Sequence, residues 1–190
     1  VALANLAATG ASWVSILVTE YQETVDSTTI YATEATPTHD DLVHAIRRAH
    51  ELGLGVMLKP HVDPLDGQWR GEIGPHFGTT EWGSWFASYR QFLVPYAQLA
   101  EELHVELFCV GVEYVTASTH GAEWRQVVAS VRAVYSGPLV YAANHSGEEL
   151  RVDWWDALDY IGVDAYYALS EDDDPSVAEL VQAWQAPKTV

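Results

Sequence analysis

Strand-like and helix-like segments alternate along the whole sequence, and this alternation constrains the fold more than any other feature. Five runs rich in β-branched and apolar residues have the pattern of buried strands. They cover residues 13–21, 55–63, 105–113, 139–144 and 160–166. Strands that alternate with helices are typical of a parallel sheet with crossover helices, so we predict an α/β fold.

The helices between these strands carry recognisable start and stop signals. Thr38 is the expected N-cap of the first, with Asp41 three residues on and Gly53 at its end. Further helices are predicted at 80–103, where Pro95 should cause a kink, and at 122–135 and 175–184, with a short one near Trp154. The segment before residue 13 reads as the end of one more helix.

The chain length favours a single, partial domain. A chain of 190 residues with 48% hydrophobic content can bury one sizeable core. A closed eight-stranded α/β barrel usually needs about 250 residues, so residues 1–190 would form one domain that is incomplete at both ends, with "PKTV" at 187–190 beginning another strand. An open doubly wound sheet is the competing architecture, but no glycine-rich phosphate loop follows any of the strands.

Charge and cysteine content exclude several partners. Nine basic and 27 acidic residues give a formal net charge of -18, which repels nucleic acid and anionic membranes. Cys109 is the single cysteine, so no intramolecular disulfide can form. No apolar run approaches the roughly 20 residues of a membrane span, and we expect no signal peptide in this chain. Neutral or cationic partners therefore fit better, and we expect no cofactor.

Polar residues collect where the predicted strands end. In parallel α/β folds the loops at the carboxyl ends of the strands converge on one face, which usually carries the chemistry. We therefore expect one cleft lined by Lys59, His61, Asp63, Glu113, Asn144 and Tyr166. By the alternation of side chains along a strand, Cys109, Gly111 and Glu113 should share one face, so that Glu113 faces the mouth if Gly111 faces the barrel axis.

These residue types suit a neutral sugar. Aromatic faces stack on pyranose rings, polar groups bind hydroxyls, and a carboxyl group can act as an acid catalyst. Trp13, and Trp69 with Arg70 in a glycine-flanked loop, are the further candidates for sugar contact. Lys59 follows a buried run directly; it could contact a ligand or form a salt bridge with Asp63 or a neighbouring strand.

Several segments resemble the retaining β-mannanases of glycoside hydrolase family 113. They are "WVSILVTEYQ", "AHELGLGVMLKPHVDPLDGQWRG", "WFASYRQFLVPYAQLA", "FCVGVEY" and "DYIGVDAYYAL", of which the run from "MLKPHVD" to "WRG" is the most specific. The resemblance covers nearly the whole chain. It implies a partial (β/α)8 TIM barrel with approximately strands two to six and the start of strand seven, acting on β-1,4-mannan or a related polysaccharide.

The resemblance also implies roles for individual residues. Glu113, at the end of barrel strand four, would be the general acid/base, and the nucleophilic glutamate would follow "APKTV", beyond Val190. Val112 stands where many relatives carry an asparagine that binds the sugar 2-hydroxyl, which bears on substrate detail. The resemblance also implies an extracellular or cell-surface location. An incomplete barrel would leave exposed strand edges, so self-association is expected.

Two other functions fit parts of the pattern. The chain could be a non-catalytic carbohydrate-binding or structural barrel, because a fold does not prove chemistry. Alternatively, His61, Asp63 and His145 could bind a catalytic metal, although a second histidine at the usual spacing is absent.

Overall fold

The computed structural model describes residues 1–189 and contains one parallel sheet of five strands in the order β1-β2-β3-β4-β5. The strands are β1 (Trp13–Gln22), β2 (Gly55–Pro64), β3 (Leu107–Val112), β4 (Leu139–Asn144) and β5 (Tyr160–Asp164). All neighbouring strands run parallel, so their carboxyl ends lie at one end of the sheet. This confirms the predicted α/β fold.

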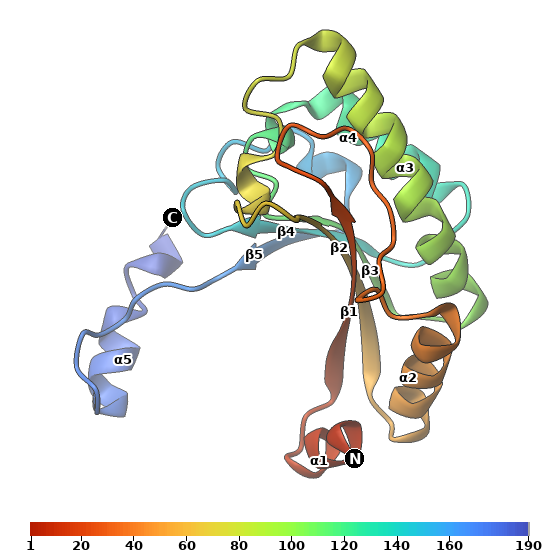
Figure 1. The fold of residues 1–190 in the computed structure, drawn as a ribbon. Helices are drawn as coiled ribbons and strands as arrows, with labels where there is room; N and C mark the ends of the chain where they lie inside the picture. The colour runs from red at the N-terminus through yellow and green to blue at the C-terminus, as the bar shows by residue number, and fades with distance from the viewer. Residues whose placement is uncertain (190) are drawn as a thin grey trace.

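Helices cover the outer side of the curved sheet (Figure 1). They are α2 (His39–Glu51), α3 (Thr79–Glu102) and α4 (Gly121–Arg132), while α1 (Ala2–Ala8) precedes β1. Thr38 and Asp41 form the predicted capping box at the start of α2, in which each side chain binds the backbone N–H of the other residue. Pro95 lies inside α3, as predicted.

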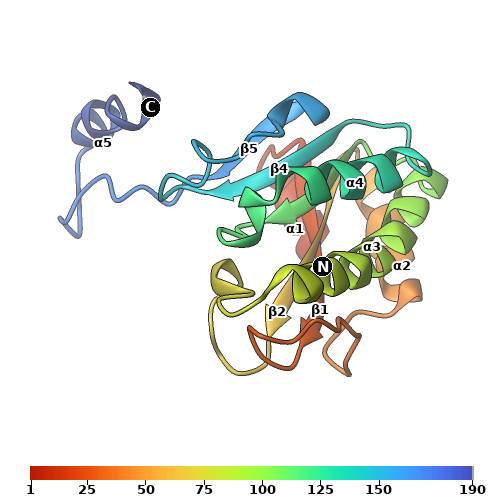
Figure 2. The ribbon, with the colours of Figure 1, turned by 90° about the horizontal axis from the view of Figure 1, so that it is seen from above.

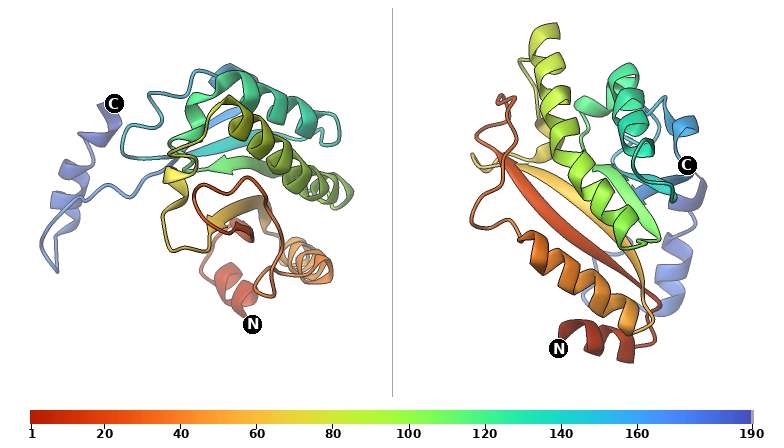
Figure 3. Two further views of the ribbon diagram at one scale, coloured as in Figure 1. Left: turned by 45° about the horizontal axis from the view of Figure 1, so that its top comes forward. Right: turned by 90° about the vertical axis from the view of Figure 1, so that its right-hand side faces the viewer.

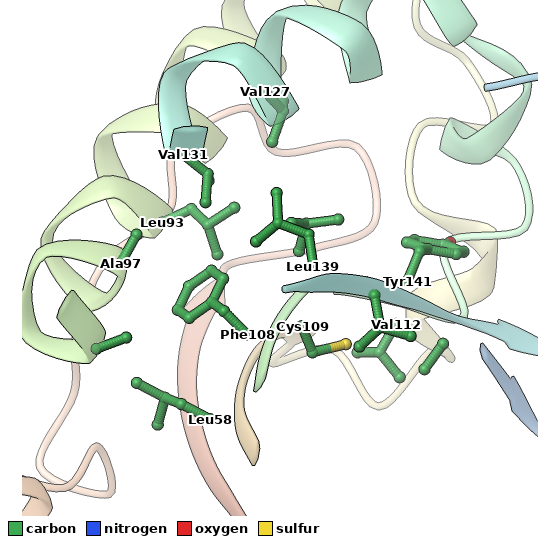
Figure 4. Close-up of a cluster of buried hydrophobic side chains, with 14 of the residues drawn as sticks. Leu58, Leu93, Ala97, Phe108, Cys109, Val112, Val127, Val131, Leu139 and Tyr141 are labelled. Carbon is green, nitrogen blue, oxygen red and sulfur yellow. The ribbon is translucent and has the colours of Figure 1, made fainter. Parts of the chain in front are cut away.

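The hydrophobic core lies between the sheet and these helices. Figure 4 shows Phe108 of β3 beside Leu93 of α3 and Val131 of α4, with Leu139 of β4 nearby. These four side chains are fully buried. At 25 cal/mol per Å² of apolar surface, burying one such large side chain stabilises the fold by about 2 kcal/mol. The helix faces of α3 and α4 therefore fix the central strands that carry the site.

The edges of the sheet are exposed to solvent. Leu17 on β1 is 51% exposed, and Tyr160 and Ile161 on β5 are 57% and 66% exposed. The right panel of Figure 3 shows β1 as a long strand along one margin of the sheet. A short bridge between Tyr21 and Tyr31 covers only one position of β1. Whether these edges cause self-association stays a prediction.

The C-terminal part departs from the prediction. Helix α5 (Val177–Ala183) has no buried residue, and Figure 2 shows it set apart from the sheet at the end of an extended segment. Pro187–Thr189 form a 3-10 turn, so the predicted start of another strand is wrong for these residues, and Val190 lies outside the described residues. Proline suits the first position of a helical turn, where its missing N–H costs nothing.

Candidate active site

The first polar side chain of the site comes from the middle of β2 and not from its carboxyl end. Lys59 is 9% exposed, and its Nζ lies 2.9 Å from both Oδ atoms of Asp164, the last residue of β5. Strands β3 and β4 separate β2 from β5 in the sheet, so this ion pair spans the concave side of the sheet. Of the two roles predicted for Lys59, the structure shows the salt bridge, and its partner is on another strand rather than Asp63.

His61 is held in one neutral form by Arg70. The guanidinium Nη1 of Arg70 lies 2.6 Å from His61 Nδ1. Because a guanidinium can only donate, Nδ1 accepts the hydrogen bond and the imidazole proton resides on Nε2. Burial, with the cations Arg70 and Lys59 nearby, lowers the pKa of His61 to about 3 from 6.5. Its Nε2 is buried without a hydrogen-bond partner among the described residues and is a free donor.

Asp63 fixes Arg70 in turn. The carboxylate of Asp63 accepts from Arg70 Nε at 2.8 Å and from Arg70 Nη2 at 3.1 Å, which is a fork-like arrangement. Arg70 follows Trp69, whose ring is 41% exposed in the loop after β2. A Cβ built on Gly71 would lie 2.6 Å from Cε3 of Trp69, so the ring packs directly over a glycine. Trp69 therefore offers an exposed aromatic face beside an ordered polar cluster.

A β-bulge and an unusual backbone conformation place Glu113. The pairing of β3 with β4 shifts between Cys109 and Val112, and Glu113 has φ of 51°. A non-glycine residue in this left-handed region costs about 1 to 2 kcal/mol, and such strain often marks functional sites. The Glu113 N–H donates to the Ala142 carbonyl at 2.9 Å, and Asn144 Nδ2 donates to Glu113 Oε1 at 3.0 Å.

The bulge overturns the predicted alternation along β3. A Cβ on Gly111 would lie 2.7 Å from the Trp124 ring and 2.8 Å from the Tyr141 ring, so Gly111 faces the helix layer and not the barrel axis. The Cys109 thiol instead lies in the field of Lys59 and Asp164 on the concave side. One extra residue in a strand reverses the facing of those that follow. Glu113 thus reaches Asn144 by the bulge and its own φ, not by simple alternation.

A buried carboxylate that the sequence did not reveal lies behind Glu113. Glu148 is 0% exposed, and burial raises the pKa of its side chain. Its Oε1 accepts from the Tyr141 hydroxyl and its Oε2 from the Asn144 N–H, both at 2.6 Å. In "NHSGEEL" nothing distinguishes Glu148 from a solvated loop residue, so only the contacts identify it.

The remaining predicted residues have different surroundings. Asn144 is 8% exposed, and its Oδ1 accepts from the Ser146 N–H at 2.9 Å, so both ends of its amide are engaged. Tyr166 is 79% exposed, with its ring centroid 6.3 Å from that of His145. Sugar contact by either Asn144 or Tyr166 stays a prediction.

The position of Trp13 contradicts its predicted place in the site. Trp13 begins β1 and borders a cavity of about 230 Å³ together with Leu107 and Tyr160, which begin β3 and β5. Ten residues at about 3.3 Å each place it roughly 30 Å from the other end of the strand. An aromatic ring at the first residue of a parallel strand lies at the amino end of the sheet, away from Glu113 and His61.

Within residues 1–189, no group of three or more His, Cys, Asp or Glu residues is arranged to hold a metal ion. The Arg70 guanidinium occupies both His61 Nδ1 and the Asp63 carboxylate, two of the three proposed ligands. In the same part of the chain, no helix is long and apolar enough to cross a membrane.

The family model and the solved structures with at least 30% identity point to the same family. The model of Glycoside Hydrolase Family 113 matches residues 1–188. A solved "GH113 beta-1,4-mannanase" is 31% identical, with a TM-score of 0.81, and the match covers 100% of this chain and 62% of that one. The GH113 β-mannanase AaManA from Alicyclobacillus acidocaldarius, solved in complex with ManMIm, is 36% identical with a TM-score of 0.82, over 98% of this chain and 60% of its own.

The chain thus spans about three fifths of the length of these solved relatives, which agrees with a partial TIM barrel. No relative is found among curated proteins. The family model covers almost every residue, and two solved structures of the same family are more than 30% identical to this chain, so both comparisons assign the chain to that family. The chain belongs to glycoside hydrolase family 113, a family of retaining β-mannanases.

Proposed function

We propose that the full-length protein hydrolyses β-1,4-linked mannan, or a related β-linked polysaccharide, with retention, and that Glu113 is the general acid/base. The observation that carries this proposal is the placement of Glu113 beyond β3, on a bulged and left-handed backbone, at the end of the sheet where His61 and Asp63 also lie. Solved family members that are β-mannanases support the substrate class.

In this mechanism Glu113 protonates the departing glycosidic oxygen and later removes a proton from the attacking water. The exposed ring of Trp69 offers an apolar face to a pyranose ring. The His61 Nε2–H is buried, so it reaches a sugar hydroxyl only where a side-chain movement exposes it. Arg70 and Asp63 act through His61, because their charged groups already bind each other and the imidazole.

The nucleophile is proposed to lie outside residues 1–190. Retention needs a second carboxylate about 5 to 5.5 Å from the first. The other carboxylates of the predicted site are already engaged: Asp63 binds Arg70 and Asp164 binds Lys59, while Glu148 is wholly buried. The family resemblance sets the nucleophile on the strand after Lys188. We therefore expect residues 1–190 by themselves to lack activity.

The test is Glu113→Gln in the full-length protein, assayed on manno-oligosaccharides and on an aryl β-mannoside with a good leaving group. We expect kcat on oligosaccharides to fall about 10² to 10⁴-fold, with a much smaller loss in the first step on the aryl substrate, whose leaving group needs little protonation. Glu51→Gln, on the exposed surface of α2, is the matched control and should leave both rates unchanged.

Two outcomes would sink the proposal. Equal and mild losses on both substrates would mean that Glu113 is a solvated residue at a strand end. Oligosaccharide binding without any release of reducing ends by the wild-type full-length protein would favour the non-catalytic carbohydrate-binding module instead.

A further inference from the structure

Two chains of hydrogen bonds connect Glu148 to Glu113, and together they form a closed ring. On one side, Glu148 Oε2 accepts from the Asn144 N–H, and Asn144 Nδ2 donates to Glu113 Oε1. On the other side, Glu148 Oε1 accepts from the Tyr141 hydroxyl, which accepts from the N–H of Tyr114 at 2.9 Å. Tyr114 follows Glu113 in the chain and is joined to it by the peptide bond, so both routes end at Glu113.

The direction of every bond in this ring is fixed. The Ser146 N–H donates to Asn144 Oδ1, so the amide cannot flip and Nδ2 must face Glu113. The Tyr114 N–H occupies the Tyr141 oxygen as a donor, so the hydroxyl proton of Tyr141 points to Glu148. The two donors of the ring therefore approach different oxygens of Glu148, which also has a side-chain hydrogen bond with Ser118. An amide at this position would present an NH2 donor in place of one oxygen and would lose one of the two bonds of the ring.

The hydrogen bonds of the ring hold Glu113, whose backbone conformation is strained. Glu113 has φ of 51°, which a glutamate does not adopt without constraint from its surroundings. The Tyr114 hydroxyl adds a further link, because it accepts from the Val62 N–H at 2.9 Å, between His61 and Asp63 on β2. Glu148 itself is fully buried and touches no solvent, so it has no direct access to a ligand.

We propose that Glu148 is a positioning residue, which, with Tyr141 and Asn144, holds the carboxyl of Glu113 in the orientation needed for proton transfer. This inference rests on the proposed function, since it assumes that Glu113 transfers the proton. Loss of the ring should displace the Glu113 carboxyl by a fraction of an ångström to an ångström. Misplacement on that scale lowers the rate of proton transfer and leaves sugar binding in place.

The experiment is a double-mutant cycle in the full-length protein with Glu148→Gln, Glu113→Gln and the combination. Glu148→Gln by itself should lower kcat on manno-oligosaccharides about 10 to 100-fold with little change in KM, and should spare the first step on an aryl β-mannoside. In the Glu113→Gln background, Glu148→Gln should cause no further loss, because no proton donor remains to be positioned.

Tyr141→Phe provides a second route to the same answer if Glu148→Gln folds poorly. It removes one hydroxyl and leaves the Asn144 arm intact, so we expect the same substrate selectivity with a smaller loss of kcat. Glu149→Gln, the neighbouring glutamate, is the control and should behave as wild type.

The outcomes separate the two proposals. If Glu113→Gln has no effect on turnover, the proposed function fails. If Glu113→Gln removes turnover but Glu148→Gln lowers oligosaccharide and aryl rates equally, or adds its full effect in the double variant, then Glu148 only supports the fold and the positioning role is overturned.

Discussion

The buried, neutral His61 should make the stability of the fold depend on pH. Its pKa is lowered to about 3, first by burial and then by the charges of Arg70 and Lys59. The unfolded chain binds a proton on this imidazole below pH 6.5, whereas the folded chain does not do so until near pH 3. The stabilisation from this group is therefore fully present above pH 6.5 and is lost progressively as the pH falls toward 3.

The size of the effect follows from the two pKa values. Each pKa unit corresponds to about 1.4 kcal/mol, so a native value near 3 against 6.5 costs about 4 kcal/mol at pH 3 and about 5 kcal/mol well below it. At pH 5 only part of this is lost, about 2 kcal/mol. His61→Gln keeps a hydrogen-bonding side chain but cannot titrate. Between pH 7.5 and pH 5, wild type should lose about 2 kcal/mol more of its free energy of unfolding than this variant.

Urea denaturation followed by tryptophan fluorescence at the two pH values measures this difference, and the eight tryptophans give a strong signal. Other groups that titrate, including Glu148, are shared by both proteins and cancel in the comparison. His44→Gln, on the exposed surface of α2, applies the same change outside the cluster and should leave the pH dependence as in wild type. Equal slopes for wild type and His61→Gln would refute the neutral, desolvated imidazole.

Two further predictions concern stability. Lys59→Met should reduce the free energy of unfolding by about 2 to 3 kcal/mol, because it leaves Asp164 without its cation. Adding Asp164→Asn should recover most of this loss. Denaturation of the single and double variants would show whether the two residues are coupled. Thr38→Ala removes the N-cap of α2 and should cost about 1 kcal/mol, whereas Thr28→Ala in the preceding loop should change the melting temperature little; equal effects would contradict the capping role.

Local patterns in the sequence were sufficient for most of the fold. The strand at 139–144 was predicted to the residue, and the capping box at Thr38 was read from two side chains, because both depend on neighbours within a few positions. The resemblance of the "MLKPHVD" segment to the family supplied the barrel. The turn at Pro187–Thr189 was missed because β-branched residues favour strands only where a neighbouring strand can pair with them.

The sequence predicted which end of the sheet carries the site, but not the contacts among its side chains. The sequence predicted Lys59, His61, Asp63 and Glu113 as site residues from strand ends, which stays a prediction, and it gave no sign of which side chain would bind which. The bulge in β3 depends on the pairing of Cys109 to Val112 with β4, and pairing across a sheet leaves no local signature. Glu148 was missed for the same reason, since its burial is set by Tyr141 and Asn144 on β4.

The charge of each partner, rather than position along the strands, best separates Glu113 from the other carboxylates at this end of the sheet. Asp63 binds the Arg70 guanidinium and Asp164 binds the Lys59 ammonium, so each of these carboxylates is paired with a cation. The contact made by Glu113 is with the neutral amide of Asn144, and its other oxygen has no partner among the described residues. A general acid/base must exist in both protonation states during one turnover. The proposed role of Glu113 therefore fits its contacts, because within residues 1–189 it is bound by a neutral donor and by no cation, whereas the other two carboxylates are tied to structural ion pairs.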